Sequence, residues 1–138
     1  MTCVDFFVPG IPQPQGSKRG FVSANGKVNL VESAAGVKPW RSDVKVFAAE
    51  AMTGQRLITG PVFLHCDFVM KRPASTPKTR ATPPATKKPD LDKLLRAIGD
   101  ALKGTVYAED SLITEIVGTK RIAEDGEQPG VHINVGDR

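Results

Sequence analysis

The sequence predicts a fold of the α+β class, because two helical patterns stand among several strand patterns. Apolar residues recur at three- and four-residue steps in residues 39–52 and 91–102, which is the spacing of amphipathic helices. Short runs rich in β-branched and aromatic residues lie before, between and after these segments, as is typical of strands. A chain of 138 residues with 40% hydrophobic content suits a single domain, residues 1–138, with a buried core.

Three short strands are expected in the N-terminal part of the chain. Residues 4–8 form the first and end at a Pro-Gly pair. Residues 11–19 contain too much proline and glycine for regular structure. Beyond them, the apolar runs at residues 21–22 and 28–31 flank an Asn-Gly pair, which is a favoured hairpin turn, and they predict two paired strands.

Two helices and three strands are expected in the rest of the chain. The first helix, residues 39–52, is followed by a glycine stop signal and by a long strand over residues 61–70. After the second helix, residues 111–123 and 130–135 predict two strands with a polar turn between them. We expect these last two strands to form a hairpin with each other.

Charge and cysteine content limit the classes of protein to consider. The net charge is +4 and the pI is about 9.2, so an argument for an anionic partner depends on where the charge lies. Cys3 and Cys66 are isolated, which excludes a disulfide framework and a cysteine zinc site, and both are expected to be reduced core residues. The chain contains no apolar run of membrane-spanning length and no signal-peptide pattern at its start, so we expect a soluble, cytoplasmic protein.

Positive charge is concentrated in residues 71–88, which contain six basic residues, four prolines and no acid. A segment of this composition cannot bury enough surface to order itself, so a flexible loop is expected. It is either a solvated linker or a surface that binds phosphates, and it leads directly into a cluster of aspartates. Its basic residues are Lys71, Arg72, Lys78, Arg80, Lys87 and Lys88.

Acidic side chains cluster around the second helix. Asp90 and Asp92 lie at its start, and Glu109 and Asp110 lie just past the turn that follows it. If the chain folds back by one helix length, three carboxylates can come together, and hard divalent cations prefer such oxygen ligands. Helix capping is the alternative, because Asp90 follows Pro89 as a suitable N-cap and Asp92 complements the helix dipole.

The second helix also has two distinct faces. On a wheel of 3.6 residues per turn, Asp92, Arg96 and Lys103 share a narrow polar stripe, and Asp100 lies about 40° beyond Arg96. This stripe is either an exposed face with an Asp-Arg pair or a place where Arg96 contacts a metal-bound phosphate. The apolar stripe that should face the core consists of Leu91, Leu94, Leu95, Ile98 and Leu102.

Three aromatic side chains are expected to lie outside this site. His65 and His132 occur within predicted strands without a second His or Cys at metal-ligand spacing, so packing or surface roles are expected. Tyr107 either packs against the turn or offers a surface on which a base can stack.

Two longer motifs occur in a specific order. An N-terminal strand runs into Val-Pro-Gly-Ile-Pro-Gln-Pro at residues 8–14. Lys-Pro-Asp-Leu-Asp at residues 88–92 is followed by Asp-Ala-Leu-Lys-Gly at 100–104 and by Glu-Asp-Ser at 109–111. In these motifs the chain resembles the RusA-type Holliday junction resolvases, small dimeric endodeoxyribonucleases of bacteria and their phages.

The resemblance covers nearly the whole chain, with the poorest match at residues 71–88. It implies a single mixed β-sheet with two main helices packed on it, in a homodimer. It also implies a magnesium-dependent endonuclease, with Mn²⁺ able to substitute, that resolves four-way junction DNA by paired symmetric nicks in recombination and repair. Neither a small-molecule cofactor nor a membrane partner is implied, and the setting is a bacterial or phage-infected cell.

Carried over position by position, the resemblance assigns Asp90, Asp92 and Asp110 as metal-binding and catalytic carboxylates. Arg96 stands where the family usually has a catalytic lysine, and arginine keeps the charge but cannot donate a proton. Lys93 and Glu109 are further departures, because the family usually has asparagine and aspartate there. The expected DNA-binding residues are Lys18, Arg19, Lys71, Arg72, Lys78, Arg80, Lys87, Lys88, Lys93, Lys103 and Lys120.

Two other classes of function remain open. In the first, the protein is a nucleic-acid-binding module without catalysis, whose acids cap the helix and whose basic loop grips the backbone. In the second, it is a metal-dependent enzyme acting on free nucleotides or sugar nucleotides, which would require a glycine-rich phosphate loop that the sequence does not display. Magnesium-dependent nicking of DNA separates both from the nuclease.

Overall fold

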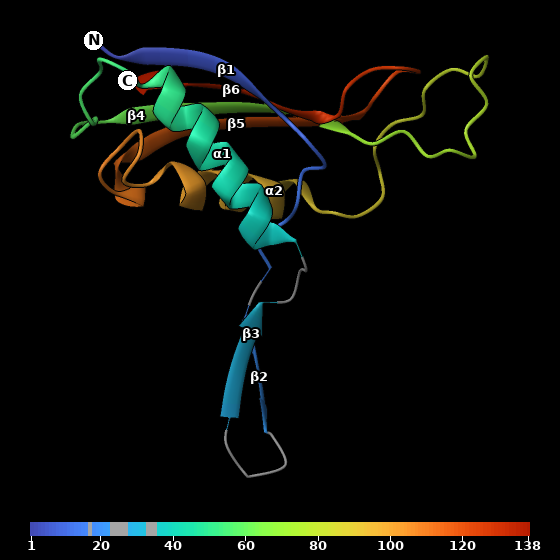
Figure 1. The fold of residues 1–138 in the computed structure, drawn as a ribbon, viewed down its shortest axis with the longest axis horizontal. Coiled ribbons are helices and arrows are strands. Elements are labelled where there is room, and N and C mark those ends of the chain that lie inside the picture. Colours follow the sequence, from blue (N-terminus) through green and yellow to red (C-terminus); the bar gives the residue numbers. More distant parts are fainter. Residues whose placement is uncertain (17, 23–27, 33–35) are drawn as a thin grey trace.

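A four-stranded mixed sheet with two helices on one face forms the body of the molecule (Figure 1). The structure is a computed structural model that describes residues 1–16, 18–22, 28–32 and 36–138. The helices are α1 (Val37–Ala51) and α2 (Leu91–Leu102). The strands of this sheet are β1 (Cys3–Pro9), β4 (Val62–Met70), β5 (Ile113–Ile122) and β6 (Gly130–Asp137). The α+β class and the mixed sheet with two helices are confirmed.

The predicted hairpin between the last two strands is wrong. The strand order is β1-β6-β4-β5, so β4 lies between β5 and β6; it pairs parallel with β5 and antiparallel with β6. Burial explains this order, because β4 carries buried Leu64, Cys66 and Phe68 and therefore needs a neighbour on both sides. Strand β5 is richer in polar residues and suits the exposed edge.

The expectation of a single sheet is also wrong. β2 (Lys18–Val22) and β3 (Val28–Glu32) form a separate antiparallel pair that projects away from the four-stranded sheet (Figure 1). The irregular stretch before them is shorter than expected, because β2 begins at Lys18. The prolines that follow β1 lack the amide hydrogen that a sheet ladder needs, which explains why β2 does not continue the main sheet. The expected Asn-Gly turn lies outside the described residues.

Element boundaries differ by a few residues from the prediction. Helix α1 begins at Val37, directly after Gly36, whose φ of 85° favours glycine. The short 3₁₀ helix η1 (Asp110–Leu112) precedes β5, so the strand starts later than expected. Residues 71–88 contain neither helix nor strand, as predicted.

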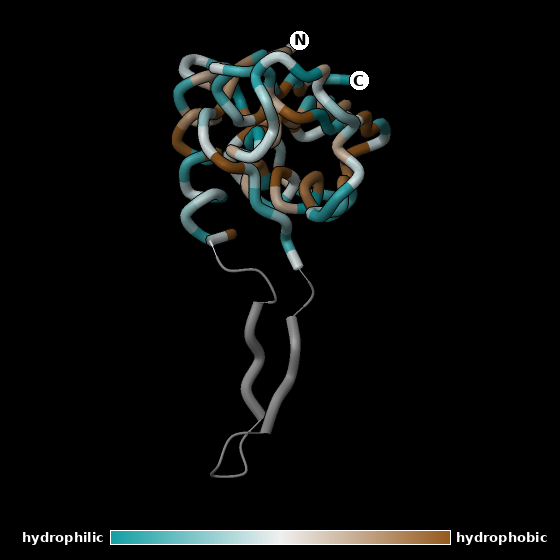
Figure 2. Tube along the Cα trace, turned by 90° about the vertical axis from the view of Figure 1, so that its right-hand side faces the viewer, coloured by the Kyte–Doolittle hydropathy of each residue, from teal (hydrophilic) through white to brown (hydrophobic). Residues whose placement is uncertain are grey.

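One hydrophobic core fills the space between the sheet and both helices. Val44 and Ala48 of α1 and Leu94 and Ile98 of α2 are fully buried in it, which confirms the apolar stripe predicted for α2. Hydrophobic and hydrophilic positions alternate along the elements (Figure 2), as expected where each element has one buried face. None of the described helices is long and apolar enough to cross a lipid bilayer.

The two cysteines have different environments. Cys66 is buried in the core, and burial raises the pKa of its thiol, so the prediction for this residue is confirmed. Cys3 is exposed, which contradicts the prediction. Side chains alternate along β1, and because Val4 and Val8 point into the core, Cys3 must point to the opposite face.

Tyr107 anchors the turn that follows α2. Its side chain is fully buried, so the packing role is correct and stacking on a base is excluded. Its hydroxyl donates a hydrogen bond of 2.8 Å to the carbonyl oxygen of Gly99 on α2. The neighbouring backbone is held by Ile58, whose amide donates to Val106 at 2.9 Å and whose carbonyl accepts from Ala108 at 3.0 Å. These contacts return the chain toward α2 just before Asp110.

We expect Tyr107→Phe to lower the free energy of unfolding by about 1 kcal/mol, because a buried hydroxyl-to-carbonyl hydrogen bond is lost. Urea denaturation measures this change. Thr53→Val is the matched control, since the Thr53 hydroxyl donates a 2.8 Å bond to Glu50 in an exposed turn; its expected effect is within about 0.5 kcal/mol. Equal losses in both variants would show that the Tyr107 bond has no special structural role.

Candidate functional site

A cleft of about 320 Å³ runs along α2 and the start of β5, and we call it the α2 cleft. Three carboxylates, those of Asp92, Asp100 and Asp110, line it together with the guanidinium of Arg96. The remaining lining residues are Leu95, Gly99, Ile113 and Ile116. The cleft therefore combines several negative charges and one positive charge with an apolar wall.

Helical spacing and one close contact position these side chains. Asp92, Arg96 and Asp100 occupy successive turns of α2 and therefore lie along one side of the helix. Helix α2 lies close to β5 at Gly118, where an added Cβ would lie 2.7 Å from Cδ1 of Leu95. Any larger residue there would push Leu95 aside or move the helix off the strand.

Asp110 reaches the cleft from the other side. It begins η1, directly after the segment that Tyr107 anchors. The pKa of Asp100 is raised, first by desolvation of its carboxyl and then by the negative charge of Asp110, while Arg41, Arg96 and Lys103 act in the opposite direction. The carboxylate of Asp110 therefore lies near enough to Asp100 to disfavour ionisation of the Asp100 carboxyl.

Asp90 occupies the N-cap position of α2 but does not cap it. Its backbone is extended, with φ −72° and ψ 141°, and its side chain makes no capping hydrogen bond. Nζ of Lys93 lies 3.9 Å from its Oδ2. Helix capping therefore does not explain why an aspartate occupies position 90. Asp90 is also not among the residues that line the α2 cleft. Of the three expected metal ligands, the structure brings Asp92 and Asp110 to the cleft.

Asp100 is the acid that the sequence analysis did not include in the site. It lines the cleft about two turns of α2 beyond Asp92, whereas Asp90, the third carboxylate that was expected, does not line it. The signal was present in the sequence, because its position on the helical wheel is about 40° from that of Arg96. The spacing of residues in the sequence could not show that the chain after α2 folds back and brings Asp110 to the same cleft as Asp100.

The donor set suits a hard divalent cation. In the parts of the chain that the structure describes, no three acidic, histidine or cysteine side chains lie close enough to form a ready-made metal cage. The side-chain groups of the α2 cleft that can act as metal ligands are nevertheless all carboxylates. Mg²⁺ commonly binds through one or two carboxylates while it keeps several waters. Asp92 of α2 and Asp110 of η1 both line the cleft and are the carboxylates available for such a site.

Lys120, an expected DNA-binding residue, binds two backbone carbonyls, and its contact with DNA stays a prediction. Its Nζ donates hydrogen bonds of 3.0 Å to Lys87 and 2.9 Å to Pro89. These two carbonyls lie at the end of the loop formed by residues 71–88, which we call the basic loop. Lys120 therefore fixes the chain to β5 immediately before Asp90.

Arg72 organises the interior of the basic loop. Its Nη1 donates to Oγ1 of Thr82 at 2.7 Å. Its Nη2 donates to the carbonyls of Pro77 at 3.1 Å and Arg80 at 3.3 Å. Thr82 in turn donates a 2.6 Å bond to Glu124, just beyond β5. The loop is thus folded around one of its own cations, while its mobility stays a prediction.

The other expected DNA-binding residues are mostly exposed. Lys93 and Lys103 pair with Asp90 and Glu109 at 3.9 Å and 3.3 Å, and exposed pairs of this kind contribute at most about 1 kcal/mol. The side chains of Lys18 and Arg19 lie outside the described part of the chain. The exposed cations of the basic loop are Lys71, Lys78, Arg80, Lys87 and Lys88.

Both histidines lie away from the α2 cleft. Nε2 of His65 is 2.7 Å from Oε2 of Glu115, whose other oxygen is 3.1 Å from Nη2 of Arg138. The hydrogen bond from His65 is the main reason that the pKa of Glu115 is lowered. The ring of His132 lies beside that of Phe7, with 4.5 Å between centroids. These contacts give the two residues structural roles in the sheet.

Comparison with known proteins adds two findings. The sequence pattern of the endodeoxyribonuclease RusA family matches residues 9–136. The chain is also similar to "Uncharacterized protein YqaN" of Bacillus subtilis (strain 168), with 29% identity over 133 residues, which cover 91% of this chain and 92% of that protein.

We expect Lys120→Met to release the end of the basic loop from β5, because two charge-assisted hydrogen bonds disappear. Hydrogen exchange of the amides in residues 86–92 should become faster by roughly 10-fold, which corresponds to about 1.4 kcal/mol. Lys78→Met, at an exposed position of the same loop, is the control. Unchanged exchange in the Lys120 variant would refute the clamp.

Proposed function

This chain belongs to the endodeoxyribonuclease RusA family, and from that premise we propose that it cuts four-way DNA junctions by paired symmetric nicks, in recombination and repair. The observation that carries the proposal is the α2 cleft, in which three carboxylates lie with Arg96. Residues 1–138 act as a single nuclease domain. The basic loop orders on DNA, since its composition favours phosphates over a buried core.

Hydrolysis of a phosphodiester requires an activated water and neutralisation of the charge that builds up on the phosphate. Mg²⁺, or Mn²⁺ in its place, supplies both when carboxylates hold it. Asp92 and Asp110 would hold this ion, with Asp90 as the third carboxylate that the family pattern assigns. Asp100 adds negative charge to the same cleft and so strengthens its attraction for a cation.

Arg96 binds the phosphate that is cut. Its guanidinium is a planar, permanently charged donor that can make two parallel hydrogen bonds to phosphate oxygens. It cannot donate a proton, so Arg96 does not protonate the leaving oxygen in this protein. Leu95, Ile113 and Ile116 line the same cleft, and an apolar wall strengthens the attraction between Arg96 and the phosphate by lowering the local dielectric.

Symmetric cutting requires two sites. A four-way junction has approximate two-fold symmetry, and a C2 homodimer presents two identical clefts to two strands. We propose that the protein acts as such a dimer. The products are nicks with a 5′-phosphate and a 3′-hydroxyl, as in the family.

A non-catalytic DNA-binding module is the second candidate. The observation that favours it is that the described residues contain no ready-made metal cage. In this case the cations of the basic loop bind the junction and the carboxylates of the cleft have no chemical role. Magnesium-dependent nicking of a junction by the unmodified protein separates the two candidates.

We expect Asp90→Asn, Asp92→Asn and Asp110→Asn each to abolish junction cleavage while junction binding and circular dichroism stay close to those of the parent. A metal ligand is lost without loss of core packing, and all three side chains are exposed. Asp43→Asn, on the exposed side of α1, is the matched control. Near-parental nicking by Asp92→Asn would refute the assignment of Asp92 as a metal ligand.

Arg96 tests the departure from the family pattern. We expect Arg96→Ala to lower the single-turnover rate on the order of 10²-fold or more, as loss of a transition-state contact does, and Arg96→Lys to retain most activity. If a titratable amine is required instead, Arg96→Lys will cut faster than the parent. Parental rates in Arg96→Ala mean that this polar stripe is only a solvated face.

A further inference from the structure

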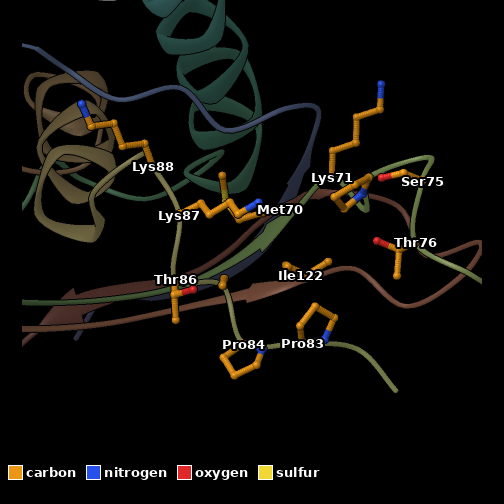
Figure 3. A pocket seen from close by; sticks show the side chains of 12 residues that line it. Met70, Lys71, Ser75, Thr76, Pro83, Pro84, Thr86, Lys87, Lys88 and Ile122 are labelled. Atoms are coloured by element: carbon orange, nitrogen blue, oxygen red, sulfur yellow. The ribbon is translucent and has the colours of Figure 1, made fainter. Parts of the chain in front are cut away.

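A second cavity, of about 480 Å³, lies beneath the basic loop at the carboxyl ends of β4 and β5 (Figure 3). We call it the loop cavity. Its floor is Met70 and Ile122, which pair across the two strands and are both partly buried. Figure 3 shows both side chains between the two halves of the loop, with Thr76 on one side and Pro84 on the other. The volume is in the range of cavities that hold small organic groups.

The chemistry of the walls favours a ligand that is both flat and anionic. Met70 and Ile122, together with the prolines of the loop, offer apolar surface, and the methionine thioether adapts to the shape of a ring. Lys71, Lys87 and Lys88 line the cavity and make its surroundings positive; Figure 3 shows the amines of Lys71 and Lys88 directed away from Met70 and Ile122. Among the described residues that line the cavity, none is acidic. A nucleotide, with a base and a phosphate, combines these two properties.

The loop cavity and the α2 cleft lie along one strand. Ile116 lines the cleft and Ile122 lines the cavity. Both are an even number of residues from Gly118, whose Cβ position faces Leu95 of α2, so both lie on the helix-covered side of β5. Their separation along the strand is about 20 Å. At the other end, Lys88 is two residues before Asp90. One DNA strand can therefore reach both places.

The cavity is held in place relative to the cleft. Lys120 lies on β5 between the two isoleucines and binds the carbonyls of Lys87 and Pro89. Arg72 holds the opposite half of the loop through Pro77 and Arg80. The two halves of the loop are thus tied to strand ends by internal hydrogen bonds, which keeps the cavity open.

We propose that the loop cavity accepts one unpaired nucleotide of the DNA strand that is cut, with its base on Met70 and Ile122 and its phosphate on Lys87 and Lys88. This inference rests on the proposed function and names the feature of the substrate that is recognised. Extruding a base from a duplex costs a few kcal/mol, and least where the base is already unpaired. The cavity therefore favours branched or gapped DNA over continuous duplex.

The test measures binding of uncut DNA in EDTA by fluorescence anisotropy. The two probes are a single-stranded oligonucleotide and a continuous duplex of the same sequence. We expect Ile122→Glu to weaken binding of the single strand by about 10-fold, because contact with a base contributes on the order of 1–3 kcal/mol. Binding of the duplex should change by less than about 2-fold. Val117→Glu, on the same strand and 47% exposed, is the matched control and should bind both probes as the parent does.

A second variant shows whether the loss of binding in Ile122→Glu comes from the cavity or from misfolding of β5. Ala85→Glu puts the same charge into the cavity from the loop, where no strand is disturbed, and Ala81→Glu is its exposed control on the same loop. We expect Ala85→Glu to lose single-strand binding as Ile122→Glu does. Parental single-strand binding by Ala85→Glu, or equal losses on both probes, overturns the proposal. Complete displacement of the single strand by a free mononucleotide at equal concentration also overturns it, because the cavity would then bind free nucleotides.

The outcome is independent of cleavage. If the parent protein shows the predicted binding preference but does not nick a junction, the proposed nuclease activity is refuted and the proposed nucleotide site in the loop cavity still stands. If the parent nicks junctions and the Ala85→Glu variant binds single strands as the parent does, the nucleotide site in the loop cavity is refuted and the nuclease activity still stands.

Discussion

Close packing of α2 on β5 is the contact on which the rest of the site depends. Gly118 lets Leu95 approach to a distance that a Cβ would prevent, and the cleft between helix and strand follows from that approach. The apolar stripe of α2 is buried in the core, so its polar stripe must face outward along β5. Tyr107 then returns the chain to α2, and Asp110 meets a helix face that already carries Asp92 and Arg96.

Cations have two different uses in this molecule. Arg72 and Lys120 bind backbone carbonyls and so give shape to a loop that lacks helix and strand. The lysines at the ends of the same loop are exposed, and the proposed function assigns them to the anionic partner. These internal hydrogen bonds limit the number of arrangements open to the loop, which would reduce the entropy lost when the loop orders on DNA.

Local patterns in the sequence predicted local structure well. The period of the apolar residues predicted α2 and its buried stripe, and the motif at residues 88–92 predicted where Asp92 would lie. The strand order could not be predicted in the same way, because the pairing of β4 with both β5 and β6 depends on contacts far apart in sequence. Composition predicted the cations of the basic loop, and the family pattern predicted Lys120, but neither could show that Arg72 and Lys120 bind backbone carbonyls within the protein. Asp100 was missed because its place in the α2 cleft becomes evident only when the fold brings Asp110 to the same cleft.

The central claim is that the carboxylates beside Arg96 form a metal-dependent nuclease site for branched DNA. The most direct measurement incubates the unmodified protein with a synthetic mobile four-way junction and separates the strands on a denaturing gel. The account predicts nicks at symmetric positions in two opposing strands, present with Mg²⁺ and absent with EDTA. An intact junction in the presence of Mg²⁺, at protein concentrations that bind it fully, would contradict the account.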